Sequence, residues 1–242
     1  ITQARLSSRR LPEKILLPIN SKHNSITLLN KRLSFCKEPI KQIFIVPEKD
    51  NKLIKFLQNN SFNYETGPEE DLISRHLIGA KKNEAEIIVR VTSDCPLVDP
   101  KELDHAIRIF KKFNNPYLYL SNHTPPENSD FPNGSDIEIF SFKCLKYIDS
   151  KYALKIDREH VTFPMWDGRE KNYIKHLKIT RNNKPINIDK IRLTLDNPED
   201  LFVLRELSKS INLETSSLRE IERIYSKLNL SKYNSKFDSR AG

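Results

Sequence analysis

Two aspartates in the chain stand where they could neutralise charge on a phosphate. Asp94 follows the apolar run 87–92, and Asp196 follows the apolar run 191–195. If both runs are parallel strands of an α/β sheet, their carboxyl ends meet at one edge, which is where such sheets bind ligands. Carboxylate oxygens are the ligands that Mg²⁺ prefers. The pair is therefore a candidate site for one Mg²⁺ that bridges phosphate oxygens during phosphoryl or nucleotidyl transfer.

These residues also have structural explanations that need no ligand. Alone, Asp196 is typical of a turn at the end of a strand. Asp99-Pro100 and Asn197-Pro198 each place a capping side chain before a proline at the first helical position, so we assign Asp99 to helix capping. Cys95 is expected to be a small packed residue, because no nearby cation marks it as a reactive thiolate.

The segment 3–14, QARLSSRRLPEK, is strongly basic and follows what resembles the end of a first strand. Guanidinium forks and an ammonium, interleaved with the Ser7 and Ser8 hydroxyls, suit a polyphosphate. A solvated basic loop without function is the alternative, and the segment alone does not decide between them. Its charged side chains are Arg5, Arg9, Arg10, Glu13 and Lys14.

Two later segments could contact a second substrate. Asp136 precedes the strand-like run 137–140, and Glu138 lies within it. Arg158 and His160 stand at the predicted start of a helix. His160 could act as a general acid or base, although a lone histidine is more often packed and hydrogen-bonded. The chain holds no Ser-His-Asp order and no H-E-x-x-H, Walker A or G-x-G-x-x-G pattern that would point to another chemistry.

Short apolar runs alternate with stretches of helical periodicity, and this alternation must position the residues above. Strand patterns occur at 43–46, 87–92, 117–121, 137–140, 174–180 and 191–195. Helical patterns occur at 26–33, 72–77, 103–110, 201–211 and 218–228. The alternation predicts a three-layer α/β fold with a mostly parallel, mixed sheet. We expect one domain over 1–230, an irregular loop over 122–134 and a polar tail over 231–242.

Composition excludes several other classes of protein. Of the 242 residues, 37% are hydrophobic and 30% charged, which suits a packed core. No apolar run approaches the roughly 20 residues that cross a bilayer, so we expect no membrane insertion. Three widely spaced cysteines indicate a reducing, cytoplasmic compartment and disfavour a zinc site. The net charge of +9 favours anionic substrates over nucleic acid, because no basic stripe interleaved with aromatic residues is present.

Taken in order, these segments give the chain a resemblance to a known family. It resembles the cytidylyltransferases of bacterial spore-coat and surface-polysaccharide biosynthesis, which are relatives of the acylneuraminate and CMP-Kdo synthetases. An ordered set of motifs is more specific than any one of them. The matching segments are QARLSSRRLPEK (3–14), GPEEDLISR (67–75), IIVRVTSDCPLVDP (87–100), FPNGSDIEIFS (131–141), REHVT (158–162) and IRLTLDNPEDL (191–201).

The resemblance implies a Rossmann-like nucleotidyltransferase fold of the GT-A type. It implies transfer of CMP from CTP to a sugar or sugar-acid acceptor with release of pyrophosphate, Mg²⁺ as the cofactor, and a homodimer. By implication Arg10, Lys14 and Asp94 are catalytic, and Asp94 and Asp196 hold the metal. The implied nucleotide contacts are Arg5, Ser8, Arg10, Lys14 and Ser93. The implied acceptor contacts are Asp136, Glu138, Arg158 and His160.

The chain departs from the family pattern at three positions where glycine is usual, which are Ser7, Glu13 and Ser93. Glycine lets backbone amides approach a phosphate closely, so side chains at these positions could reshape the phosphate site. Glu13 also adds a negative charge, which is unfavourable beside a triphosphate unless Arg9 pairs with it. The alternative function is therefore a catalytically silent relative that binds nucleotide or regulates a partner enzyme.

Overall fold

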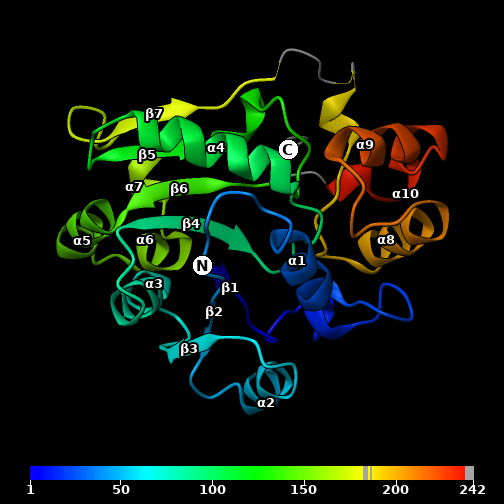
Figure 1. Cartoon of the computed structure of the whole chain (residues 1–242), viewed down its shortest axis with the longest axis horizontal. Coiled ribbons are helices and arrows are strands. Elements are labelled where there is room, and N and C mark those ends of the chain that lie inside the picture. Colours follow the sequence, from blue (N-terminus) through cyan, green and yellow to red (C-terminus); the bar gives the residue numbers. More distant parts are fainter. Residues whose placement is uncertain (182–184, 186, 238–242) are drawn as a thin grey trace.

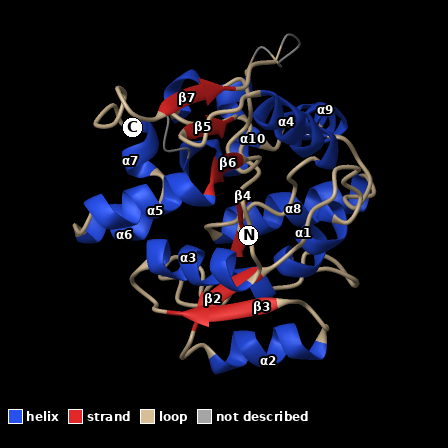
Figure 2. Cartoon of the chain, turned by 60° about the vertical axis from the view of Figure 1, so that its left-hand side comes forward, coloured by secondary structure: helices blue, strands red, loops and turns tan. Residues whose placement is uncertain are grey.

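A seven-stranded sheet forms the centre of the computed structural model, which describes residues 1–181, 185 and 187–237 (Figures 1 and 2). The strand order is β3-β2-β1-β4-β6-β5-β7. Its strands are β1 (Thr2–Gln3), β2 (Phe44–Pro47), β3 (Tyr64–Gly67), β4 (Ile87–Thr92), β5 (Leu118–Ser121), β6 (Glu138–Ser141) and β7 (Lys175–Lys178). β6 runs antiparallel to both of its neighbours, and the other neighbouring strands pair in parallel. The predicted mostly parallel, mixed sheet is confirmed.

Helices cover both faces of this sheet, which gives the three predicted layers. Apolar residues of α1, α4, α8 and α9 pack on one face, and those of α3 and α5 pack on the other. The helices are α1 (Ser25–Leu33), α2 (Asn51–Asn59), α3 (Leu72–Lys82), α4 (Pro100–Lys112), α5 (Phe142–Lys151), α6 (Lys155–His160), α7 (Phe163–Trp166), α8 (Pro198–Ser210), α9 (Leu218–Lys227) and α10 (Ser231–Asn234).

Helix caps anchor the segments that lead away from the sheet edge. Asp99 accepts a hydrogen bond from the Lys101 amide (2.9 Å) at the start of α4, as predicted. Its second oxygen accepts from the Leu218 amide (2.6 Å), so one carboxylate serves the first turns of both α4 and α9. At the start of α8, Asp200 accepts from the Asn197 amide (2.9 Å). These contacts satisfy amides that a helix leaves without an internal partner.

The segment 191–195, which the apolar pattern predicts as a strand, does not join the sheet. It makes one isolated bridge, between Arg192 and Asn133. Single backbone bonds and the burial of its apolar side chains in the core also hold it. The neighbouring Gly134 explains the close approach: its φ is +95°, and a Cβ there would lie 2.1 Å from the Thr194 nitrogen. The two loops therefore touch backbone to backbone, and a tight loop contact replaces the expected ladder.

Two further expectations differ from the structure. Arg158 and His160 lie in the last turn of α6, which begins at Lys155, and do not open a helix. Within the predicted polar tail, residues 231–237 form α10 and a 3₁₀ turn, and residues 238–242 lie outside the described part of the chain. Asn234 is fully buried, and its side-chain amide donates to the Arg192 carbonyl (3.0 Å) and to Asp200 (2.9 Å). In the described ranges no helix has the length and apolar character to cross a membrane.

Candidate active site

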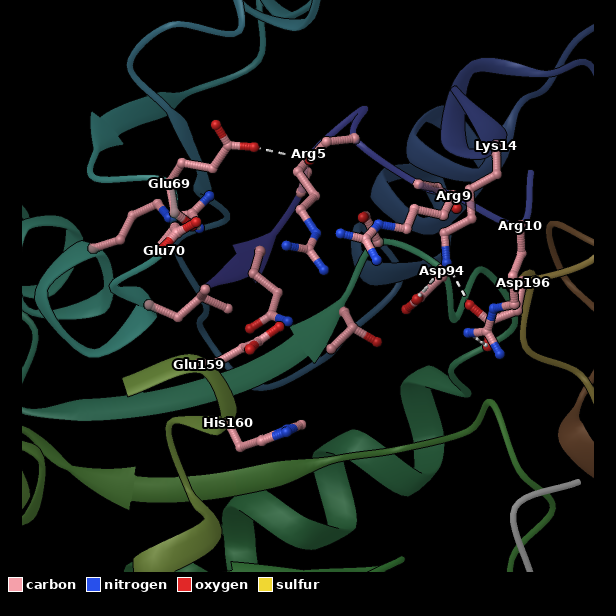
Figure 3. Close-up of a pocket in the computed structure, with 18 of the residues that line it drawn as sticks. Arg5, Arg9, Arg10, Lys14, Glu69, Glu70, Asp94, Glu159, His160 and Asp196 are labelled. Carbon is pink, nitrogen blue, oxygen red and sulfur yellow. Dashed lines mark hydrogen bonds and ion pairs between the residues drawn. The ribbon is translucent and has the colours of Figure 1, made fainter. Parts of the chain in front are cut away.

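A cavity of about 930 Å³ opens at the carboxyl ends of β1 and β4. Four stretches of chain and Asp196 line it: the basic segment 3–14, the start of α3, the end of β4 and the end of α6. Figure 3 shows Glu69 and Glu70 on one side, and Lys14, Asp94 and Asp196 on the other, with Arg5 between them. This position at the sheet edge is the one expected for ligand binding in open α/β sheets. The volume lies within the range of small-molecule sites.

The two predicted carboxylates converge on one cation. The Lys14 Nζ lies 2.8 Å from Asp94 Oδ2 and 2.6 Å from Asp196 Oδ1. Arg10 reaches the other oxygen of Asp196 from the open side, at 3.2 Å. Arg192 reaches the same oxygen from the buried side, at 3.1 Å. Residues from the two ends of the chain therefore form one charged cluster at the cavity wall.

The local backbone explains how Lys14 reaches this position. A short 3₁₀ turn, Lys14–Leu16, follows Glu13, and the side chain of Ile15 is buried beneath it. Glu13 itself has a φ of +54°, in the left-handed region that favours glycine. This sharp change of direction places Lys14 over the carboxylates and the apolar Ile15 into the core.

Backbone bonds fix the two carboxylates relative to each other. The Leu195 amide donates to the Asp94 carbonyl at 2.8 Å, which ties the end of β4 to the segment before Asp196. The Asp196 amide donates to Asp200 at 3.0 Å, so the first turn of α8 also holds this residue. The convergence of the pair is therefore a property of the backbone and does not depend on Lys14 alone.

The charges in this cluster favour one another. Burial raises the pKa of Asp94, and the Lys14 ammonium together with the hydrogen bond from Thr92 lowers it by more, so the net shift is below the ordinary value. Burial lowers the pKa of Lys14, whereas Asp94 and Asp196 raise it, and the net shift is upward. Asp94 and Lys14 are consequently held in their charged forms at neutral pH.

The donor set fits a magnesium ion bound together with a phosphate. In the ranges that the structure describes, no three His, Cys, Asp or Glu side chains gather where they could hold a metal by themselves. Mg²⁺ is commonly bound by one or two carboxylates, with substrate phosphates and water supplying the other ligands. Asp94 and Asp196 already lie within contact distance of one common cation, the Lys14 ammonium, and so match this pattern.

The remaining predicted nucleotide contacts line the same cavity. Arg5, Ser8, Arg10 and Ser93 all border it. Ser93 is buried, its amide donates to the Gln3 carbonyl (3.1 Å), and its carbonyl accepts from the Ser25 hydroxyl. These bonds make Ser93 a fixed part of the cavity floor.

Glu13 pairs with Lys52, and not with Arg9, which was the partner considered from the sequence. Its carboxylate accepts from the Lys52 ammonium at 2.6 Å, on the exposed surface beside α2. Glu13 is not among the residues that line the cavity, whereas Arg9 is. The reversed backbone at Glu13 turns the side chain outward, so its charge does not face the proposed triphosphate site.

A second cavity, of about 190 Å³, adjoins the first and shares Arg90, Thr92 and His160 with it. Asp136 and Glu138, which the resemblance implies as acceptor contacts, line it. Glu138 is already engaged: it accepts from Arg90, from the Tyr119 hydroxyl and from Thr162 (2.6 Å). Glu138 and Arg90 therefore hold each other in place at the cavity wall.

Arg158 lines neither cavity, which corrects its predicted role as an acceptor contact. Its guanidinium donates to both oxygens of Asp71 (2.9 and 2.7 Å) and to Asp149 (2.7 Å). It thereby joins α6 to the start of α3 and the end of α5. The neighbouring Glu159 and His160 face the large cavity instead.

Sequence reasoning missed two cavity arginines. Arg90 lies inside the apolar strand β4, and its Nε and Nη2 donate to Gln3 Oε1 at 3.2 and 2.9 Å. Arg75 lies on α3, donates to the Glu69 carbonyl (2.9 Å), and its Nε has no partner among the described residues. Burial, with Arg5 nearby, lowers the pKa of Arg75 to about 10. Each arginine stands within an otherwise apolar strand or helix face, and this was the signal available in the sequence. A buried charge needs an ion-pair partner or a ligand.

Comparison with known proteins places this site in a family. The family model described as cytidylyltransferase matches residues 1–235. The chain belongs to the cytidylyltransferase family. It is thus a nucleotidyltransferase, and the resemblance read from the ordered motifs is confirmed.

Individual relatives agree with this assignment. A solved cytidylyltransferase from Leptospira borgpetersenii is 30% identical, with a TM-score of 0.86 over 96% of this chain and 95% of the other. The spore coat polysaccharide biosynthesis protein SpsF of Bacillus subtilis is 26% identical over 213 residues, which is 86% of this chain and 84% of the relative. A solved CMP:2-keto-3-deoxy-manno-octonic acid synthetase, complexed with CTP, is 16% identical with a TM-score of 0.60 over 86% and 97% of the two chains. At that identity the last similarity shows a shared fold.

Proposed function

We propose that this cytidylyltransferase transfers CMP from CTP to a hydroxyl of a small sugar or sugar-acid acceptor, with release of pyrophosphate, for surface glycan biosynthesis. The observation that carries the proposal is the convergence of Asp94 and Asp196 on Lys14 beside a cavity lined by arginines. The sugar-acid acceptor and the role in glycan biosynthesis are proposed from two similar proteins, the CMP:2-keto-3-deoxy-manno-octonic acid synthetase and the spore coat polysaccharide biosynthesis protein SpsF.

The charge distribution supports a triphosphate along the basic segment. Arg9, Arg10 and Lys14 lie on the side of the large cavity that holds the carboxylate pair, and Arg5 lies between that side and Glu69. Mg²⁺, held by Asp94 and Asp196, would supply neutralisation of the phosphate charge. Guanidinium groups can bind phosphate oxygens in a bidentate manner, and a fixed cationic wall stabilises charge that develops during transfer.

The proposed reaction is a displacement at the α-phosphorus of CTP. The acceptor oxygen forms a bond to that phosphorus, the bond to the bridging oxygen of pyrophosphate breaks, and its electron pair leaves with pyrophosphate. The hydroxyl proton passes to Asp136 and then to solvent. Two observations support this role: Asp136 lines the smaller cavity, and Cys95 Sγ lies 3.8 Å from Asp94 Oδ1 and 4.0 Å from Asp136 Oδ2, so the two carboxylates are close to each other.

The experiment that tests this function measures pyrophosphate release from CTP and Mg²⁺ with a panel of sugars and sugar acids. We expect release that depends on CTP and on an acceptor, together with a thermal shift on adding CTP alone. A CTP-induced shift without release for any acceptor would favour the catalytically silent relative. The absence of both signals would refute the proposal.

We also propose a homodimer, as the resemblance implies. Leu154 and Ile156, at the start of α6, are 66% and 54% exposed and would be covered in such an assembly. Sedimentation of the full chain, and of Leu154→Asp, measures this directly. A monomer at all concentrations would refute it.

A further inference from the structure

The segment that follows α9 packs against the helix that begins directly after Asp196. Figure 1 shows α10 beside α8 and α9. Tyr233 of α10 meets Phe202 of α8 edge to face, with ring centroids 4.7 Å apart. Asp196 stands immediately before Asn197, the capping residue of α8. The predicted polar tail is therefore folded onto the element that carries one of the two site aspartates.

Asn234, at the end of α10, uses both hydrogens and the oxygen of its side-chain amide. The amide nitrogen donates to the Arg192 carbonyl (3.0 Å) and to Asp200 Oδ1 (2.9 Å). The amide oxygen accepts from the Tyr225 hydroxyl of α9 (2.7 Å). Because Asn234 is fully buried, water does not compete for these bonds. A single amide group thus joins the extended segment before Asp196, the first turn of α8 and the helix α9.

The two residues that Asn234 bridges form a buried ion pair. Arg192 Nε donates to Asp200 Oδ1 (3.0 Å), and Arg192 Nη2 donates to Asp200 Oδ2 (3.2 Å). The side chains of both residues are almost completely buried. Asn234 therefore holds the backbone of Arg192 and also the carboxylate that the Arg192 guanidinium binds. Both contacts fix the direction in which this guanidinium points.

The same guanidinium contacts the site. Arg192 Nη2 lies 3.1 Å from Asp196 Oδ2, and the other oxygen of Asp196, Oδ1, binds the Lys14 ammonium at 2.6 Å. Arg10 also reaches Asp196 Oδ2, but its side chain is 62% exposed, so the buried Arg192 is the firmer restraint. Holding Oδ2 from the buried side turns Oδ1 toward the cation that Asp196 shares with Asp94.

We infer that Asn234 is a positioning residue for Asp196. Through Asp200 and Arg192 it keeps one oxygen of the Asp196 carboxylate engaged and leaves the other for the cation of the site. Asn234 lines neither of the two cavities, so it acts only through these partners. The loss of a group that orients a ligating side chain lowers affinity or rate by about 10–100-fold. The kinetic consequence rests on the proposed function, whereas the geometric consequence does not.

The kinetic test compares two neighbouring residues of α10. Asn234→Leu removes the amide and keeps a side chain of similar size. We expect kcat for pyrophosphate release to fall at least about tenfold, with KM for CTP within about twofold of its original value. The matched control is Tyr233→Leu, which removes the ring contact with Phe202 and leaves the hydrogen bonds of Asn234 in place. It should lower Tm and leave kcat per folded molecule unchanged.

An equal fall of kcat in both variants, or no fall in Asn234→Leu, would overturn the inference. Should Asn234→Leu fail to fold, Tyr225→Phe replaces it, because this variant removes only the hydroxyl that donates to Asn234 and to the Lys190 carbonyl. We then expect a roughly threefold fall in kcat, the scale of one hydrogen bond. An unchanged kcat in Tyr225→Phe would count against the inference in that case.

A crystal structure of the variant that folds tests the positioning without catalysis. We expect the distance between Arg192 Nη2 and Asp196 Oδ2 to exceed about 3.5 Å, the limit of a hydrogen bond. A distance that stays at 3.1 Å would overturn the inference, whatever the kinetics show. If the unsubstituted protein releases no pyrophosphate with any acceptor, the proposed function fails, and this distance alone decides whether Asn234 positions Asp196.

Discussion

Asp94 and Asp196 bind the same ammonium group, that of Lys14, at 2.8 and 2.6 Å. They reach it from different segments, because Asp94 follows β4 and Asp196 precedes α8. Both carboxylates line the cavity and share one cation, so we treat them as one functional unit. Removing one member should therefore affect catalysis much more than folding.

We expect Asp94→Asn and Asp196→Asn each to lower kcat for pyrophosphate release by about 10²–10³-fold, the usual cost of losing one electrostatic contact to a transition state. Both should also need more Mg²⁺ for half-maximal rate. The control is Glu70→Gln, which removes a carboxylate from the far side of the same cavity, where Glu70 pairs with Lys155 at the surface. A variant of either aspartate with full activity would remove that residue from the site.

The pairing also predicts how stability depends on pH. The pKa of Asp94 lies below its ordinary value of 3.8 in the folded state: burial raises it, and the Lys14 ammonium together with the hydrogen bond from Thr92 outweighs that effect. Its contribution to stability is therefore complete above about pH 3.8 and is lost as the pH falls through the lower folded value. Chemical denaturation at a series of acidic pH values measures this loss.

Lys14→Met tests the same linkage from the other partner. At neutral pH the variant leaves two adjacent carboxylates without their cation, which should cost about 2 kcal/mol of unfolding free energy for this partly buried cluster. The difference from the unsubstituted protein should shrink as acid protonates Asp94. A difference that stays constant from neutral to acidic pH would show that Lys14 acts through packing alone.

The sequence was sufficient for the outline of the sheet and for the meeting of the two aspartates. Apolar runs marked most strands, and the rule that parallel strands present their carboxyl ends together brought Asp94 and Asp196 to one edge. The prediction that residues 191–195 form a strand of the sheet before Asp196 was nevertheless wrong. This segment makes a close backbone contact with Gly134 and does not pair with a neighbouring strand of the sheet. The pattern could not distinguish a buried extended loop from a buried strand, because both are apolar.

Long-range ion pairs set the limit of sequence reasoning at the acceptor side. The role of Arg158 depends on Asp71 and Asp149, which belong to other helices, and nothing in the local sequence names those partners. Three further elements, β3, α2 and α5, were missed. Length was not the reason for the two helices, because α2 and α5 have 9 and 10 residues, as do the predicted α1 and α9. Side-chain roles were predictable only where the sheet edge determines them.

Because Arg158 joins three helices, its loss should affect stability and spare chemistry. We expect Arg158→Met to lower the unfolding free energy by about 2 kcal/mol, which corresponds to a fall in Tm of roughly 4–8 °C for a chain of this size. Activity per folded molecule should change little. The matched control is Lys155→Met, on the same helix as Arg158. This variant breaks the exposed ion pair between Lys155 and Glu70 and should leave Tm nearly unchanged. A raised acceptor KM with an unaltered Tm would instead assign Arg158 to the substrate site.

Glu13 offers a test of the departure from glycine in the basic segment. Its φ of +54° is left-handed, a conformation that costs a residue with a Cβ about 1–2 kcal/mol and glycine almost nothing. Glu13→Gly and Glu13→Ala both remove the ion pair with Lys52, so their difference isolates the backbone. We expect Glu13→Gly to be the more stable by about 1 kcal/mol, or roughly 2–4 °C in Tm, after allowing for the greater freedom of glycine in the unfolded chain.

The control for that comparison is Lys52→Ala, which removes the exposed partner without touching the backbone and should change Tm little. Pyrophosphate release should be nearly equal in all three variants, because Glu13 does not line the cavity. If Glu13→Gly proves no more stable than Glu13→Ala, the left-handed turn is not strained. If Glu13→Gly alone gains activity, the side chain at position 13 hinders phosphate binding. Glu13 would then not point away from the cavity during the reaction.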